Sequence, residues 1–223
     1  MKLKTAIILA GGKALRMRPV TEGIPKCMVE VSGQPLLYWI LKWLKLNGIE
    51  RVILGVDYKK EVIIEYIKNS DFGMSITYND HSTAEETGDA VRLAIEKQNI
   101  TDEVFLVMNG DELTDVSLSN FLTFHNSHKP VATLLSCPLR SNFGVITVSS
   151  DHSVTDFKEK PIIDNHFMNA GVYIFTQDIR KYLPQRGSLE KTAFVQLAGE
   201  GKLKAFKYFG FWSTVDSPKD LMA

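Results

Sequence analysis

Hydrophobic positions recur along the chain with two different periods. Short continuous apolar runs that end at glycine or polar residues are typical of strands buried on both faces of a parallel sheet. Between these runs, apolar residues are spaced as on one face of a helix. In the first half of the chain this pattern predicts strands over residues 6–10, 51–57, 74–78 and 103–108, and helices from Pro35 to just before Gly48 and over 61–68 and 88–98.

The second half of the chain has more strands and fewer helices between them. The pattern predicts strands over residues 131–137, 145–149, 154–158, 172–176 and 203–209, and helices over 118–126 and 188–197. Strands that alternate with helices favour a parallel sheet, whereas successive strands favour antiparallel additions. We therefore predict an α/β fold of the Rossmann-like type, with three α/β/α layers around a mixed, mainly parallel central sheet.

Composition narrows the class of protein. The chain has 223 residues, 44% of them hydrophobic, and contains no stretch that resembles a linker, so we expect a single domain over residues 1–223. Lysine plus arginine and aspartate plus glutamate each number 26, so the charge balance argues against a nucleic-acid or membrane partner. The apolar runs are shorter than the roughly 20 residues of a membrane helix. We expect a cytoplasmic protein, in which Cys27 and Cys137 are free thiols.

The residues that follow the first predicted strand are rich in glycine and arginine. Positions 10 to 19 are A-G-G-K-A-L-R-M-R-P. Open α/β sheets bind ligands at the carboxyl ends of their strands, where glycines let backbone N–H groups approach phosphate. A plain turn is the alternative interpretation, since neither G-x-x-x-x-G-K-[ST] nor G-x-G-x-x-G is present. Asp57, at the end of the second strand, keeps a dinucleotide-binding dehydrogenase as a remote alternative.

Several further motifs follow in a fixed order, and the loop that begins at Gly11 is longer than the usual strand-to-helix connection. Together they resemble the pattern of the sugar-1-phosphate nucleotidylyltransferases, which join a nucleoside triphosphate to a sugar 1-phosphate. The matching segments span nearly the whole chain: Leu9 to Gly12 with Arg16, Pro19 and Thr21; Pro25, Lys26 and Met28; Gly33 to Leu37; Thr87 to Ala90; Asn109 to Asp111; Phe157 to Pro161; Asn169 to Tyr173; and Gly210 to Asp216.

The resemblance implies a role for each matching residue. The nucleotide-binding residues are Leu9, Ala10, Gly11, Gly12, Arg16, Lys26, Thr87 and Gly88, with Thr87 and Gly88 beside the base. The sugar-phosphate-binding residues are Asn109, Gly144, Glu159, Lys160 and Asn169, and the catalytic residues are Arg16, Lys26, Asp111 and Lys160. Nucleotidyl transfer suits such a set, because the attacking phosphate is already ionised and the protein has to align two polyanions and neutralise their repulsion.

The resemblance also implies Mg²⁺ as cofactor, held by Asp111 and Asp216. Mg²⁺ usually takes one or two protein carboxylates and completes its octahedron with phosphate oxygens and water. Each aspartate has a structural alternative, because N-G-D is a common turn and an aspartate before Ser217 suits a helix cap. The five histidines show no spacing of metal ligands, and Trp39 and Trp43 are interpreted as core residues.

Two positions depart from the family pattern. Ala14-Leu15 replaces the usual glycine-threonine before the arginine, and Glu86 stands where the family commonly has glycine. These changes support a second hypothesis, a catalytically weak or inactive homologue that binds nucleotide sugar and acts as a regulatory or scaffold subunit. We favour the enzyme because both aspartates and both lysines of the pattern are retained.

The substrate predictions are therefore a nucleoside triphosphate and a hexose 1-phosphate. Guanine, thymine, uracil and cytosine all stay open as the base, as do the identity of the sugar and a homo-oligomer. Because the sequence ends at Ala223, shortly after Asp216, we expect the catalytic core without a C-terminal β-helix extension.

Overall fold

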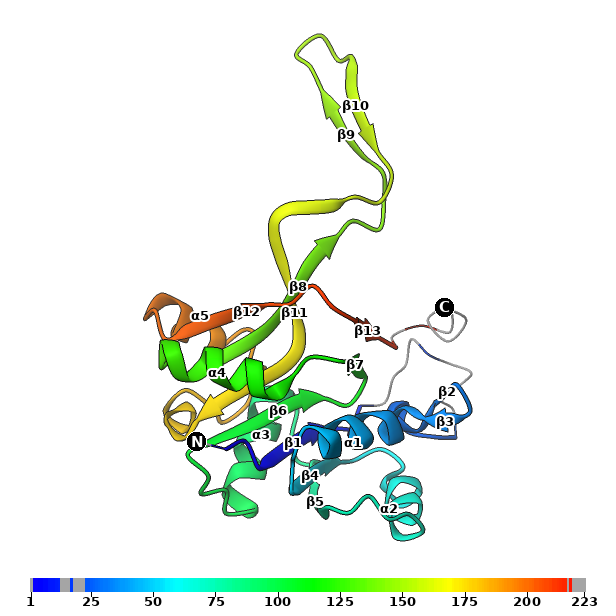
Figure 1. Cartoon of the computed structure of the whole chain (residues 1–223), viewed down its shortest axis with the longest axis vertical. Coiled ribbons are helices and arrows are strands. Elements are labelled where there is room, and N and C mark those ends of the chain that lie inside the picture. The colour runs from blue at the N-terminus through cyan, green and yellow to red at the C-terminus, as the bar shows by residue number, and fades with distance from the viewer. Residues whose placement is uncertain (1, 13–16, 18–22, 216, 218–223) are drawn as a thin grey trace.

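The computed structural model describes residues 2–12, 17, 23–215 and 217. Seven strands form its central sheet: β1 (Thr5–Leu9), β4 (Arg51–Val56), β5 (Ser75–Asp80), β6 (Val104–Asn109), β8 (Ala132–Arg140), β11 (Ile162–Thr176) and β12 (Leu203–Lys207). They are arranged in the order β12-β8-β11-β6-β1-β4-β5 (Figure 1). Because β1 pairs in parallel with both β4 and β6, the carboxyl ends of these strands meet at one edge.

A single strand of this sheet is reversed. β11 runs antiparallel to both of its neighbours, β6 and β8, whereas β12 is parallel to β8 and β5 is parallel to β4. The predicted mixed, mainly parallel α/β sheet is thus confirmed. The continuous apolar runs are explained by burial on both faces, since Ala6 and Ile8 belong to one hydrophobic cluster and Ile7 to another.

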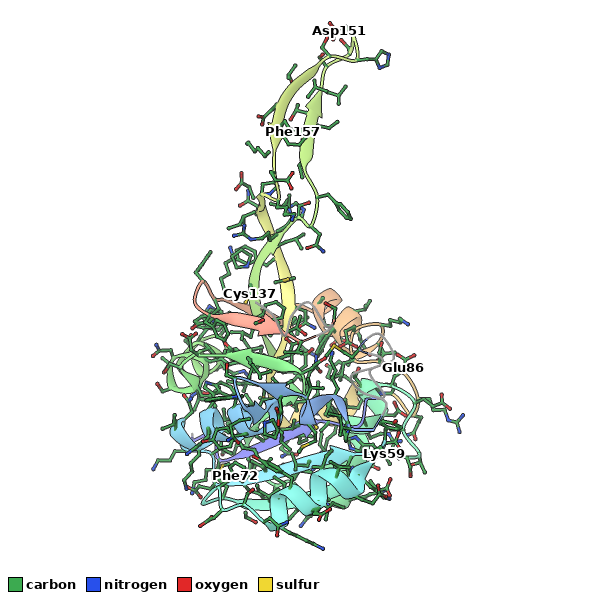
Figure 2. The ribbon with its side chains drawn as sticks, turned by 90° about the vertical axis from the view of Figure 1, so that its right-hand side faces the viewer. Lys59, Phe72, Glu86, Cys137, Asp151 and Phe157 are labelled. Carbon is green, nitrogen blue, oxygen red and sulfur yellow. The ribbon has the colours of Figure 1, made fainter. Side chains whose placement is uncertain are left out.

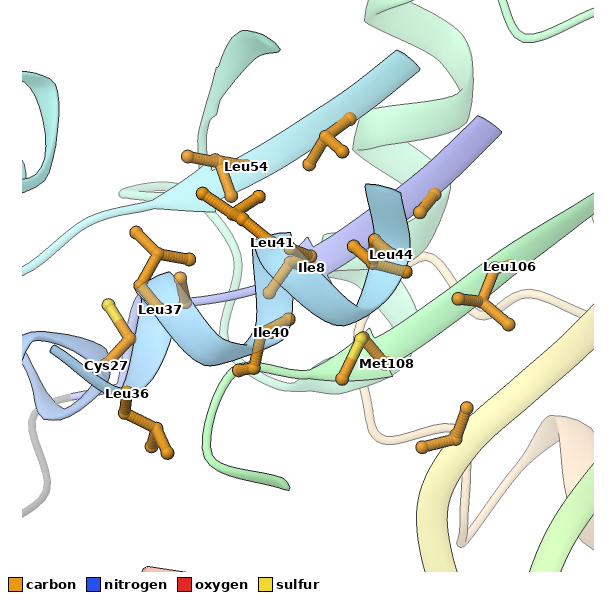
Figure 3. Close-up of a cluster of buried hydrophobic side chains, with 14 of the residues drawn as sticks. Ile8, Cys27, Leu36, Leu37, Ile40, Leu41, Leu44, Leu54, Leu106 and Met108 are labelled. Carbon is orange, nitrogen blue, oxygen red and sulfur yellow. The ribbon is translucent and has the colours of Figure 1, made fainter. Parts of the chain in front are cut away.

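Helices cover both faces of the sheet. The first cluster contains residues of α1 (Leu36–Leu46), α2 (Lys60–Lys68) and α4 (Leu118–His128), and the second contains residues of α3 (Thr87–Lys97), α5 (Ala193–Gly199) and the 3₁₀ helix η3 (Gln177–Lys181). Figure 3 shows α1 directing Leu37, Leu41 and Leu44 toward the strands. Each fully buried leucine contributes about 1.5–3 kcal/mol to stability, so the apolar face of α1 holds this helix on the sheet.

Two helix boundaries differ from the predicted ones. Pro35 is the residue before α1 rather than its first residue, and the helix is followed by Gly48 in a left-handed conformation (φ +82°). α5 begins at Ala193 rather than at Ser188. The Ser188 hydroxyl accepts a hydrogen bond from the Lys191 amide, and the Ser188 carbonyl accepts one from the Thr192 side chain. These local bonds compete with helical ones and delay the start of the helix.

Several short elements lie outside the central sheet. β9 (Val145–Val148) and β10 (Val154–Lys158) were expected as strands of the mixed sheet, but they pair with each other in a two-stranded ribbon that projects from the body (Figures 1 and 2). β7 (Glu112–Thr114) pairs with β13 (Trp212–Thr214), and β2 (Glu30–Val31) pairs with β3 (Gln34–Pro35). The 3₁₀ helix η2 (Lys26–Met28) precedes β2. None of the helices in the described part of the chain has the length and apolar character needed to traverse a bilayer.

Candidate active site

A cavity of about 780 Å³ lies at the carboxyl edge of the sheet. Four neighbouring parallel strands end there, and the residues directly after them line it: Ala10 to Gly12 after β1, Asp57 after β4, His81 after β5 and Gly110 with Asp111 after β6. Further lining comes from Lys26 and Cys27 in η2 and from residues 84–87 at the start of α3. Ligand sites of open α/β proteins occupy this position.

Glycines let the strand ends approach one another closely at this edge. A Cβ on Gly110 would lie 2.9 Å from the Leu9 carbonyl oxygen, which accepts a hydrogen bond from the Gly110 amide. A Cβ on Gly11 would lie 3.1 Å from the Cβ of Asp57, whereas one on Gly12 would meet no atom of the described residues within 4 Å. Gly11 and Gly110 therefore allow their backbones to lie close to neighbouring strand ends.

Lys26 and Asp111 form an ion pair at the cavity. The Lys26 Nζ donates to Asp111 Oδ2 at 2.5 Å, and their side chains are 13% and 25% exposed. The two residues are 85 positions apart in the sequence and come from η2 and from the turn between β6 and β7. The C-terminal segment also contacts this turn, because the Val215 amide donates to the Asp111 carbonyl. The residue after Val215 is Asp216, which itself lies outside the described residues.

His81 is a buried and neutral member of the lining. Its side chain is 6% exposed, and burial, aided by the charge of Lys97, lowers its pKa to about 4. Within the described residues, its Nε2 atom has no hydrogen-bond partner. The ring lies against Gly55 of β4, where any Cβ would overlap it. The sequence patterns gave the histidines no role, and the one available indication was a glycine inside an otherwise β-branched, apolar strand.

Glu86, the departure from the family pattern, caps α3. It is the residue before the helix and forms a capping box with Asp89, whose carboxylate accepts hydrogen bonds from the Glu85 and Glu86 amides at 2.8 and 3.0 Å. Asp89 is 1% exposed, so this box fixes the segment firmly. Glu85 and Glu86 both line the cavity, and the Glu85 carboxylate forms an ion pair with Arg186 at 2.9 Å.

The structure brings most of the predicted nucleotide-binding residues together. The cavity lining includes six of them, Leu9, Ala10, Gly11, Gly12, Lys26 and Thr87, together with the predicted sugar-phosphate residue Asn109 and the predicted catalytic and metal residue Asp111. Arg16 and Asp216, like Ala14 and Leu15, lie outside the described residues.

Gly88 has a different environment from the one expected. It does not line the cavity; a Cβ there would lie 2.5 Å from the Gly187 carbonyl oxygen and 2.7 Å from Pro184. The neighbouring Thr87 hydroxyl donates to Glu190 and accepts from the Leu189 amide. This corner of α3 thus packs against residues 184–190.

The remaining sugar-phosphate residues also lie away from the cavity lining. Gly144, Glu159 and Lys160 are at the base of the β9–β10 ribbon, where a Cβ on Gly144 would lie 2.8 Å from the Phe157 ring. Asn169 is in β11, donates to the Tyr173 hydroxyl at 2.8 Å and accepts from the Gly171 amide at 3.1 Å.

The donor set is compatible with a magnesium ion. Within the described residues, no group of three or more histidine, cysteine, aspartate or glutamate side chains could hold a metal. Asp111 presents a hard carboxylate at the cavity, and Mg²⁺ needs only one or two such ligands when phosphate oxygens complete its shell. The site therefore fits a metal that arrives with a phosphate ligand.

The fold and the place of the cavity define an α/β protein with its ligand crevice at the carboxyl ends of parallel strands. The profile of the family described as "Nucleotidyl transferase" matches residues 5–223, and the chain belongs to this family. The predicted resemblance to the sugar-1-phosphate nucleotidylyltransferases is thereby confirmed.

Several relatives are similar over almost all of this chain. A probable glucose-1-phosphate cytidylyltransferase from Bacillus subtilis is 32% identical, covering 97% of this chain and 93% of that protein. The bifunctional protein GlmU from Methanococcus aeolicus is 36% identical, and a probable mannose-1-phosphate guanylyltransferase from Oryza sativa is 30% identical. The chain spans 52% and 62% of the length of these two proteins.

Solved structures show the same fold. HddC from Yersinia pseudotuberculosis superposes with a TM-score of 0.77 at 24% identity, covering 99% of this chain and 97% of that one. The crystal structure of HddC complexed with GMP-PN gives a TM-score of 0.75 at 26% identity, with the same coverage.

Proposed function

We propose that this protein transfers a nucleotidyl group from a nucleoside triphosphate to a hexose 1-phosphate, giving a nucleotide sugar and pyrophosphate. The observation that carries the proposal is the meeting of Lys26 and Asp111 at the carboxyl edge of the sheet, in a chain whose relatives include cytidylyl- and guanylyltransferases. A cation and a hard carboxylate at one point suit a ligand that carries both phosphate and a divalent metal.

The reaction needs little chemistry from the protein itself. The sugar phosphate oxygen is already ionised and attacks the α-phosphorus, while pyrophosphate leaves on the opposite side. Gly11 and Gly12 offer backbone to the triphosphate, and Lys26 neutralises phosphate charge. Arg16 is proposed to add a second cation from the glycine loop.

Asp111 and Asp216 are proposed to hold Mg²⁺. The hydrogen bond from the Val215 amide to the Asp111 carbonyl supports this pairing, because it brings the residue before Asp216 next to Asp111. When bound, the metal withdraws charge from the phosphate oxygens. Lys26 donates to Asp111 Oδ2, and this ion pair holds the carboxylate in place at the cavity.

The base is proposed to lie between His81 and the start of α3. A neutral imidazole with its Nε2 unpartnered among the described residues can donate or accept one hydrogen bond to a base edge, depending on its tautomer. Glu85, which is paired with Arg186, and Glu86, whose side chain also caps α3, would accept from amino groups of the base or hydroxyls of the ribose. Pyrophosphate release with each triphosphate measures which base this part of the cavity selects.

A homologue with weak or no catalytic activity is the second candidate, motivated by Ala14-Leu15 and Glu86. The capping box gives Glu86 a structural role at the start of the helix that borders the cavity, so we do not take this departure as an argument against activity.

Pyrophosphate release separates the two candidates. Each common triphosphate is incubated with glucose, mannose and related hexose 1-phosphates, with and without Mg²⁺, and binding is measured in parallel by calorimetry. The enzyme proposal expects turnover with at least one pair that stops when the metal is chelated. Binding of a nucleotide or nucleotide sugar without turnover of any pair would favour the inactive homologue.

A further inference from the structure

The carboxylate of Asp57 differs from the other described carboxylates that line the cavity. The others, Glu85, Glu86 and Asp111, are held by an arginine, a helix amide and a lysine. Within the described residues, no side chain or amide forms a hydrogen bond or an ion pair with the Asp57 carboxylate, and Lys60, which follows it closely, is paired with another aspartate. Asp57 is partly buried, so its carboxylate needs donors that a ligand can supply.

Asp57 belongs to a row of residues that crosses three strand ends. In the parallel register of β1, β4 and β5, the residues at one level are Leu9, Gly55 and Asn79. Two residues further along each strand are Gly11, Asp57 and His81, which therefore lie next to one another at the carboxyl edge of the sheet (Figure 1). Two contacts agree with this row: the His81 amide donates to the Val56 carbonyl at 2.8 Å, and a Cβ on Gly11 would lie 3.1 Å from the Asp57 Cβ.

His81 adds a second unpartnered polar group beside Asp57. Its side chain is 6% exposed, and its Nε2 atom has no hydrogen-bond partner among the described residues. Burial and the charge of Lys97 lower the pKa of His81 to about 4, although Asp57 is one of the carboxylates that act in the opposite direction. A neutral imidazole has one N–H donor and one nitrogen acceptor. The row therefore places a carboxylate, which only accepts, next to a ring that can donate.

The row leads away from the place proposed for the reacting phosphate. Asp111 follows β6, and β1, β4 and β5 succeed it in the sheet at a spacing of about 4.8 Å. With the reacting phosphate at β6 and at the glycines after β1, a ribose occupies about one strand spacing and the base lies over β4 and β5. Asp57 and His81 then face the edge of the base.

The common bases present different donors on their Watson–Crick edges. Guanine has two adjacent donors, N1–H and the 2-amino group, beside the acceptor O6. Cytosine and adenine have one amino group next to a ring nitrogen that accepts, and uracil and thymine have one N–H between two carbonyl oxygens. Guanine is therefore the one common base whose edge satisfies both oxygens of a carboxylate without placing an acceptor against them.

We propose that Asp57 selects guanine, with its two carboxylate oxygens accepting from N1–H and the 2-amino group while the His81 ring donates to O6, so that the nucleoside triphosphate is GTP. This inference rests on the proposed function for the direction in which the nucleotide lies. A bidentate pair of this kind contributes about 10- to 100-fold to the discrimination between bases.

Calorimetry in the presence of Mg²⁺ and without sugar phosphate measures base selection apart from turnover. The wild type is expected to bind GTP about 10-fold or more tightly than CTP, UTP, dTTP or ATP. ITP, whose base lacks the 2-amino group, is expected to bind about 10-fold more weakly than GTP. Tighter binding of a pyrimidine nucleotide, or equal binding of GTP and ITP, overturns the proposal.

Asp57→Asn is expected to change the preferred base. The amide keeps one acceptor and gains one donor, so it matches xanthine, in which a carbonyl at C2 lies next to N1–H. The variant should bind GTP about 10- to 100-fold more weakly than the wild type does, and XTP more tightly. A gain of XTP binding also shows that the variant is folded. An unchanged ratio of GTP to XTP affinity overturns the proposal.

Asp71→Asn is the matched control for this substitution. Asp71 is an exposed aspartate after α2 and is not part of the cavity lining, so the variant should bind GTP as the wild type does. An equal loss of GTP affinity in Asp71→Asn would assign the effect to the change of net charge and overturn the base contact.

Contact with the ribose is the competing explanation for a loss of GTP affinity, because a carboxylate also accepts from hydroxyl groups. GTP analogues that lack the 2′- or the 3′-hydroxyl separate the two contacts. If Asp57 binds the base, removal of either hydroxyl changes affinity by the same factor in the wild type and in Asp57→Asn. A factor that disappears in the variant assigns Asp57 to the ribose and overturns selection of the base.

Turnover decides the proposed function separately. Binding that favours GTP, without pyrophosphate release from any hexose 1-phosphate, supports selection of guanine and overturns the proposed transfer. Pyrophosphate release with CTP or UTP in preference to GTP supports the transfer and overturns selection of guanine.

Discussion

At the residue scale, Gly55 and His81 depend on each other. The ring of His81 occupies the space where any side chain at position 55 would begin, and this contact keeps the imidazole buried. We expect Gly55→Ala to push the ring toward solvent and to raise its pKa from about 4 toward the ordinary value near 6.5. Nucleotide affinity is expected to fall with it.

Proton NMR titration of the histidine rings measures this change. His125 is an internal control, since burial lowers its pKa to about 4 and it lies in α4, apart from Gly55. An unaltered His81 titration in the variant would show that Gly55 does not determine the position of the ring.

Asp111 is the second residue with a specific expectation. Asp111→Asn removes the charge that pairs with Lys26 and the carboxylate proposed for the metal, so kcat is expected to fall by about 10²-fold or more. Asp178→Asn, an exposed aspartate on η3, is the matched control and should retain wild-type kcat. Metal-dependent turnover that persists in Asp111→Asn removes this residue from the metal site, and circular dichroism verifies that the variant folds.

Residue identities alone predicted part of this site. Lys26, Asp111 and the glycines belong to short local motifs, and the structure brings them to one cavity. His81 could not be predicted, because its burial and its unpartnered Nε2 arise from β5 lying next to β4. The environment of Gly88 could not be predicted either, because its close contact with Gly187 joins segments that are far apart in the sequence.

At the element scale, the start of α3 depends on a close contact between backbones. The Gly88 amide donates to the Gly187 carbonyl, and there is no room for a Cβ. We expect Gly88→Ala to lower the free energy of unfolding by about 1–3 kcal/mol through overpacking, and to move Glu86 and Thr87 at the cavity. Gly199→Ala, in α5 where the new Cβ meets no atom of the described residues within 4 Å, should be neutral or slightly stabilising.

Urea denaturation of both variants checks this expectation. Equal free energies of unfolding for Gly88→Ala and the wild type would mean that residues 184–187 shift to accommodate the new Cβ without loss of stability. A loss of stability in Gly199→Ala of the same size would assign the effect to glycine replacement in general.

Elements differ in how far the apolar pattern determined them. Strands β1, β4 and β6 were predictable because burial on both faces demands continuous apolar runs. The ribbon strands were predicted as strands but assigned to the wrong sheet, because alternation specifies a face and not the surface that covers it. The β7–β13 pair was not predicted at all, since three-residue strands have no resolvable period.

At the scale of the whole molecule, two buried histidines tie stability to pH. His81 and His125 have pKa values lowered by burial to about 4, against about 6.5 in the unfolded chain. Above pH 6.5 both states are neutral and stability is complete. Between pH 6.5 and 4 the unfolded state takes up protons that the folded state does not, so the unfolding free energy falls by up to about 1.4 kcal/mol per pH unit for each histidine.

Comparison with His125→Gln isolates this contribution, because carboxylates titrate alike in both proteins and cancel in the difference. We expect the urea-derived unfolding free energies of the wild type and the variant to differ in slope between pH 6.5 and 4 and to run parallel above pH 7. Parallel curves throughout this range would show that His125 protonates equally in both states.

The reversed strand β11 has a consequence for the order in which a growing polypeptide assembles. β5, β4, β1 and β6 are all made by Asn109, but β8 is joined to them only through β11, which ends at Thr176. Until then the nascent chain has an open edge along β6, whose sequence V-F-L-V-M-N is apolar and prone to intermolecular pairing. We therefore expect the chain to be most prone to aggregation while residues 110–176 are being translated.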